Sequence, residues 1–85
     1  MGRFQGKIVD ENRQFIADVE GILEISEDAG GWMSWWGSFL LERAEGAKLS
    51  SYLLVLNDGR EGKIFLKHFD VQSMRARFRG TGPLE

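Results

Sequence analysis

Cysteine is missing from this 85-residue sequence, and histidine and proline occur once each. Without cysteine the chain has no disulfide framework and no thiolate zinc site. A lone histidine, His68, excludes a multi-histidine metal centre and a Cys/His catalytic pair within one chain. We therefore expect no catalytic residues, no metal, no cofactor and no enzymatic activity. Packing must stabilise the fold, and we expect His68 to be a structural, hydrogen-bonded histidine on the core face.

Long hydrophobic runs are missing too. No apolar stretch approaches the roughly 20 residues that span a bilayer, and the N-terminus lacks the form of a signal peptide, so we expect no membrane partner and a cytoplasmic location. The formal net charge of −2 is too small to indicate a nucleic-acid or membrane partner by itself. Its distribution is uneven, with four basic and nine acidic residues in 1–46 against seven and four in 47–85.

The clearest pattern present is a hairpin between Leu49 and Asp70, where two β-prone runs flank Asn57-Asp58-Gly59. In a three-residue loop with Gly59 in the left-handed conformation, Leu56 lies opposite Arg60. This register gives the larger apolar inner face, and we prefer it to a two-residue Asp58-Gly59 turn, which moves the pairing by one residue. The inner face then carries Tyr52, Leu54, Leu56, Gly62, Ile64, Leu66 and His68.

A second hairpin is predicted from two alternating stretches, Arg3 to Asp10 and Gln14 to Ser26. A two-residue turn at Glu11-Asn12 places Ile8 opposite Phe15 and Phe4 near Val19, so both strands turn their apolar side chains to one face. The later strand is long, and Gly21 in its middle predicts a bend or bulge.

Alternation continues over Trp32 to Arg43, with Trp35, Gly37, Phe39 and Leu41 on one face, and over Ser73 to Gly80. About six strands at close spacing predict an all-β fold. We expect a small antiparallel barrel, closed or partly open, and keep a two-sheet β-sandwich as the alternative. Residues 1–83 are expected to form a single barrel-like domain, and residues 84–85 are interpreted as a cloning remnant.

Several large apolar residues have no place on the predicted inner faces, and exposed patches of this kind indicate interfaces. The leading hypothesis is therefore a non-enzymatic binding or assembly module that self-associates or binds a protein partner. Its candidate interface residues are Trp36, Leu40, Leu53, Val55, Phe65 and Phe69.

The alternative hypothesis is nucleic-acid or polyanion binding through an arginine-bearing strand face with an exposed tryptophan. Trp35 and Trp36 must face opposite sides of a strand, so at least one tryptophan of the cluster is expected near the surface or under a neighbouring segment. We favour a core position, or a loop tryptophan that plugs an open barrel end, over a stacking platform. The candidate residues are Trp32, Lys63, Lys67, Arg75, Arg77 and Arg79. A competing interpretation pairs these arginines with the acidic strand face of Asp18, Glu20 and Glu24, and we favour that pairing.

Overall fold

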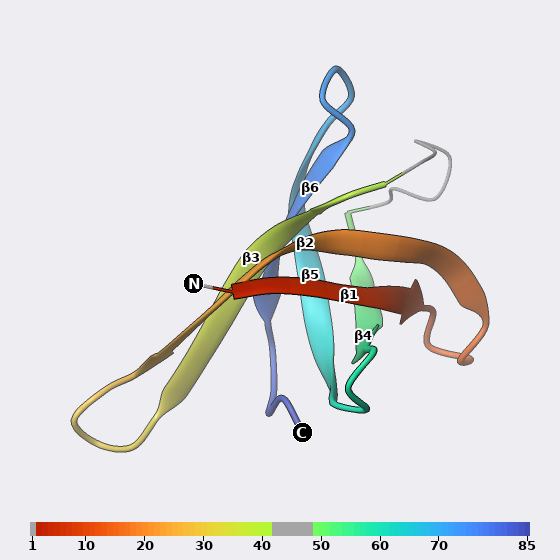
Figure 1. The fold of residues 1–85 in the computed structure, drawn as a ribbon. Coiled ribbons are helices and arrows are strands. Elements are labelled where there is room, and N and C mark those ends of the chain that lie inside the picture. Colours follow the sequence, from red (N-terminus) through yellow and green to blue (C-terminus); the bar gives the residue numbers. More distant parts are fainter. Residues whose placement is uncertain (1, 42–48) are drawn as a thin grey trace.

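The described residues, 2–41 and 49–85 of the computed structural model, form six antiparallel strands closed into a barrel (Figure 1). Around the barrel the order is β1, β2, β3, β6, β5 and β4, and β4 pairs back with β1. This confirms the all-β prediction and selects the closed barrel over the sandwich. The strands are β1 (Gly2–Val9), β2 (Phe15–Glu27), β3 (Met33–Leu40), β4 (Ser51–Leu56), β5 (Glu61–Asp70) and β6 (Arg75–Gly80).

The β4–β5 hairpin has the register that its turn sequence predicts. The Leu56 N–H donates to the Arg60 carbonyl at 2.8 Å, so residues 57–59 form a three-residue loop. Gly59 has φ +97°, in the region where a Cβ is strained. The preferred alternative is confirmed, and the buried side chains of this hairpin are Tyr52, Leu54, Leu56, Ile64 and Leu66.

The β1–β2 hairpin differs from its predicted register because its loop is longer and a β-bulge follows it. The Asp10 N–H donates to the Gln14 carbonyl at 3.0 Å, which closes a three-residue loop. Ile8 consequently pairs with Ala17. The three-residue loop pairs Phe15 with Val9 and turns its side chain outward, where it is 59 % exposed, so the prediction that Phe15 lies in the core opposite Ile8 is wrong. The bulge follows this pair and brings Ala17 opposite Ile8.

A second bulge lies between Leu66 and His68 on β5. It turns the two side chains that follow it, His68 and Phe69, to the faces opposite to those predicted. His68 is exposed, so its predicted place on the core face is wrong. Phe69 turns inward and packs, partly buried, against the core. Phe69 therefore leaves the outer face on which the interface hypothesis placed it.

β2 is long because it pairs with two neighbouring strands over different parts of its length. It pairs with β1 as far as Leu23 and with β3 from Glu20 to Glu27. A Cβ on Gly21 would lie 1.9 Å from the Ser38 carbonyl oxygen, so only glycine lets β3 approach this closely. β6 pairs with β3 over residues 36–40, and the segments 25–27 and 33–35 continue as a two-stranded ribbon that projects from the barrel (Figure 1).

Trp35 fills the barrel where this ribbon begins. Its side chain is 2 % exposed, and its indole N–H donates to the Gly82 carbonyl at 2.7 Å. Cβ atoms added at Gly62 and Gly80 would lie 2.7 and 2.0 Å from the indole ring, so glycines on β5 and β6 leave the space it occupies. Trp35 and Trp36 thus face opposite sides of β3, as the alternation predicts.

The segment after β6, residues 81–85, continues in the same direction beside β5. The Thr81 N–H donates to the Lys63 carbonyl at 2.9 Å, and the Glu85 N–H donates to the Glu61 carbonyl at 3.0 Å. Leu84 is buried and belongs to the core cluster. The origin of residues 84–85 as a cloning remnant stays a prediction. A domain that ends at residue 83 would leave out the buried Leu84 side chain.

Candidate functional site

β6 presents three arginines on the outer surface of the barrel. Arg75, Arg77 and Arg79 are exposed and alternate with the buried Ala76 and Phe78. Alternate residues of a strand are about 6.6 Å apart, twice the rise per residue. Because β6 lies between β3 and β5, the side chains on those two strands surround this arginine row.

Arg79 lies between two aromatic side chains. It pairs with Trp36 on β3 and with Phe65 on β5. Trp36 is 39 % exposed and Phe65 is 37 % exposed, so both rings reach the surface. This part of the barrel therefore offers an apolar face on each side of a cation.

The other two arginines have few charged neighbours. Arg77 pairs with Ser38 on β3 and with His68 on β5. Arg75 pairs with Asp70 on β5, and its Nη1 donates to the Ser38 Oγ at 2.9 Å. Within the described ranges none of the three arginines takes part in an ion pair, because the pairs found there are Arg13–Glu61 and Arg60–Asp58.

Asp70 is the one carboxylate that pairs across the sheet with this row, opposite Arg75. The backbone N–H of Gln72 donates to its Oδ1 at 3.0 Å. This bond, followed by one from the Ser73 hydroxyl, lowers the pKa of Asp70. Asp70 is therefore ionised at neutral pH, and its negative charge lies beside Arg75 at that end of the row.

The favoured pairing of the arginines with the acidic face of β2 does not form among the described residues. β3 separates β6 from β2, so the two charged faces are not adjacent. The expected partners were Asp18, Glu20 and Glu24.

A tight loop holds Trp32 at the outer end of the ribbon. The Asp28 carboxylate accepts hydrogen bonds from the Gly30 N–H at 2.9 Å and from the Trp32 N–H at 3.0 Å. The Asp28 N–H donates to the Trp32 carbonyl at 3.0 Å, and Gly31 has φ +83°. The backbone of Trp32 is thus anchored while its side chain is 77 % exposed.

The ribbon and the segment after β6 enclose a cleft of about 960 Å³, which we call the tryptophan cleft. Two cations, Lys67 and Arg79, lie in its lining together with the exposed Trp32 and Trp36. None of its lining residues is Asp or Glu, so its charged groups are all positive. The lining is Trp32, Met33, Ser34, Trp35, Trp36, Lys67, Arg79, Gly80, Thr81, Gly82 and Pro83.

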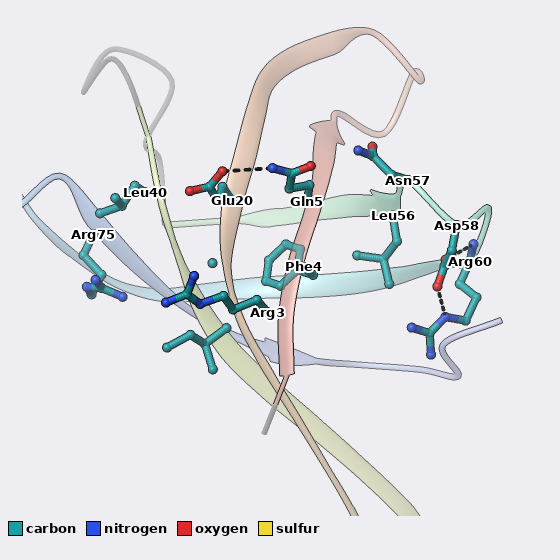
Figure 2. A pocket seen from close by; sticks show the side chains of 12 residues that line it. Arg3, Phe4, Gln5, Glu20, Leu40, Leu56, Asn57, Asp58, Arg60 and Arg75 are labelled. Atoms are coloured by element: carbon teal, nitrogen blue, oxygen red, sulfur yellow. Dashed lines mark hydrogen bonds and ion pairs between the residues drawn. The ribbon is translucent and has the colours of Figure 1, made fainter.

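A second concavity, of about 670 Å³, is shown in Figure 2. Arg75 and Arg3 lie towards one end of it, and the Asp58–Arg60 ion pair lies at the other. The backbone N–H of Arg60 lowers the pKa of Asp58, so that carboxylate is charged and bound within its own turn. Arg75 thus belongs to this concavity and Arg79 to the tryptophan cleft.

The side chains predicted as an apolar interface do not form one surface. β3 and β4 are three strands apart in either direction around the barrel. Leu53 and Val55 on β4 are half-buried and lie on the opposite side of the barrel from Trp36 and Leu40 on β3. Phe65 lies with the arginine row instead.

The residues predicted for polyanion binding fall closer together. Lys67, Trp32 and Arg79 share the tryptophan cleft, and Arg77 and Arg75 continue from it along β6. Lys63 lines a separate concavity of about 460 Å³ with residues of the β1–β2 loop.

Sequence reasoning missed Met33 and the segment of residues 80–83 as walls of the cleft. That segment is held in place by the Trp35 indole N–H, a contact between residues 47 positions apart, which no local pattern signals.

Comparisons with protein-family models, with curated proteins and with solved structures find no match to this chain. None of the described residues belongs to a helix that could cross a membrane. Within the same residues, no group of three or more His, Asp or Glu side chains is arranged to hold a metal ion.

Proposed function

We propose that this protein is a non-enzymatic binding module for nucleic acid or a related polyanion that carries flat rings. The observation that carries the proposal is the tryptophan cleft, where two exposed indoles and two cations meet without a carboxylate in the lining. Proteins that bind single-stranded nucleic acid combine such stacking rings with a positive groove.

The two kinds of group contribute in different ways. A base stacked on an aromatic side chain adds about 1–3 kcal/mol of binding free energy. Lys67 and Arg79 can pair with phosphates and release condensed counterions, which makes the affinity depend on salt. Because the net charge of the chain is −2, attraction must come from this local arrangement and not from the molecule as a whole.

Replacing Trp32 by alanine tests the stacking contribution. We expect Trp32→Ala to weaken binding of a fluorescein-labelled oligothymidylate by about 5- to 150-fold, equivalent to the free energy of one stacked base. Fluorescence anisotropy at low and high salt measures the affinity. Because the Trp32 side chain is 77 % exposed, the variant should keep the wild-type thermal midpoint. Absence of saturable binding by the wild-type protein at low salt would contradict the proposal.

A second candidate function is self-association, and a row of apolar side chains favours it. Val9 on β1 pairs with Phe15 on β2 and with Leu53 on β4. Phe15 is 59 % exposed, and an exposed aromatic side chain beside other apolar residues is typical of an interface.

Sedimentation equilibrium tests this second candidate. A dimer joined through the row should dissociate when Phe15 is replaced by serine, whereas Leu49→Ser, also at an exposed apolar position, should leave the mass unchanged. If the wild-type protein stays monomeric at millimolar concentration, self-association is excluded as its function.

A further inference from the structure

We infer that the ligand is a single strand of nucleic acid and that it runs along β6 from the tryptophan cleft to the concavity of Figure 2. This inference rests on the proposed function and adds to it the kind of polymer and its path. It predicts a binding site for several nucleotides instead of a pocket for one.

The arginine row connects the two hollows of the surface. Arg79 lines the tryptophan cleft, Arg75 lines the second concavity, and Arg77 lies between them on the same face of β6. The step of about 6.6 Å between alternate strand residues is close to the separation of successive phosphates in an extended single strand. From Arg79 to Arg75 the row therefore spans about 13 Å, enough for three phosphates.

The strands beside β6 leave most of this path open to an anion. Arg79 has aromatic neighbours on both sides, and Arg77 has Ser38 and His68, neither of which is a carboxylate. The exceptions lie at the far end, where Asp70 pairs with Arg75, and where Glu20 and Asp58 line the concavity together with Arg3 and Arg60. These carboxylates weaken the attraction for an anion there. Contacts with phosphate should consequently be strongest at the cleft and weakest at Arg75.

The exposed tryptophans favour a single strand over a duplex. Stacking on Trp32 or Trp36 needs the free face of a base, and a duplex buries those faces between neighbouring pairs. A polyanion without rings, such as polyphosphate, could use the arginines but not the indoles. The site therefore fits unpaired nucleotides better than either of these ligands.

A length series measures the path. Labelled oligothymidylates of two, four and eight nucleotides are titrated with the wild-type protein, and we expect affinity to rise up to about four nucleotides and then to level off. That length allows one stacked nucleotide and three phosphates on the arginine row. Thymidine monophosphate, an eight-base-pair duplex and polyphosphate serve as unlabelled competitors and should all compete weakly.

Single arginine variants locate the strand on β6. Arg75→Ala should weaken binding of the eight-nucleotide strand several-fold and leave the two-nucleotide strand unchanged, because the short ligand remains at the cleft. Arg79→Ala should weaken both. For the long strand, each substitution should make the plot of log binding constant against log salt concentration less steep by about 0.7, because one phosphate contact is lost. Lys7→Ala is the matched control, since Lys7 is an exposed cation on β1, three strands from β6 in either direction.

The outcomes separate the inference from the proposed function. If two nucleotides or the monophosphate bind as tightly as eight, and Arg75→Ala has no effect, the path along β6 is wrong while the cleft keeps its proposed role. Equal affinity for duplex or polyphosphate overturns the single-strand assignment. If none of these anions binds at low salt, both the path and the proposed function fail.

Discussion

Neighbouring tryptophans in this protein have opposite roles because of strand alternation. Trp35 points into the barrel and its ring lies against two glycines, whereas Trp36 points outward beside Arg79. The Cβ that would be added at Gly80 lies only 2.0 Å from the indole, so this contact leaves no room for adjustment by a flexible side chain. Residue 80 therefore determines whether the barrel can close over Trp35.

Substitution of Gly80 by alanine should be strongly destabilising. The added methyl group must displace either the indole or β6, and overpacking of this kind costs about 1–3 kcal/mol or more. Urea denaturation measures the loss. Gly2→Ala is the matched control, because a Cβ there has no atom within 4 Å. Equal stability of the two variants would show that Trp35 moves aside without cost.

The loops of the β1–β2 and β4–β5 hairpins explain which element predictions succeed. Asn57-Asp58-Gly59 contains the glycine that its left-handed position requires, so its register follows from the sequence. In the β1–β2 loop the left-handed residue is Arg13, with φ 61°, and its side chain gives no sign of that conformation. The predicted two-residue turn was therefore one residue too short, which is why Phe15 was misplaced. The sequence also gives no sign of the bulge on β5, which inserts one residue into an otherwise regular alternation, and His68 was misplaced for that reason.

Gly59→Ala should destabilise the β4–β5 hairpin for reasons of backbone conformation alone. Nothing lies within 4 Å of a Cβ at this position, but its φ of +97° is unfavourable for alanine by about 1–2 kcal/mol. Gly82→Ala, which also has open space and no positive φ, should change stability far less. Chemical denaturation of both variants makes the comparison, and equal midpoints would argue against the left-handed turn.

At the scale of the whole molecule, strand order decides which residues become neighbours. The alternating pattern predicts which face of each strand is buried, and it correctly predicts that Arg75, Arg77 and Arg79 share an outer face. It carries no information on which strands flank β6. The cleft could not be predicted for that reason, because β3, β5, β6 and the segment after β6 all contribute to it.

Residue 84 contributes to the core of the barrel, although the sequence interpretation set residues 84–85 apart as a cloning remnant. Because Leu84 is buried in the core cluster, we expect Leu84→Ala to cost about 2–5 kcal/mol. Leu49→Ala, at a position 58 % exposed, is the control. Thermal unfolding that is the same for both variants would place Leu84 outside the core.

The contrast between Trp35 and the other two tryptophans gives this protein two separate optical signals. Trp35 is shielded and hydrogen-bonded, so its emission should lie at shorter wavelength than that of Trp32 and Trp36, which face water. Iodide in solution should quench the long-wavelength component and leave the short-wavelength one until the barrel opens. In a single unlabelled sample, the long-wavelength emission can thus report whether a ligand covers Trp32 and Trp36. The short-wavelength emission can report whether the barrel around Trp35 is still folded.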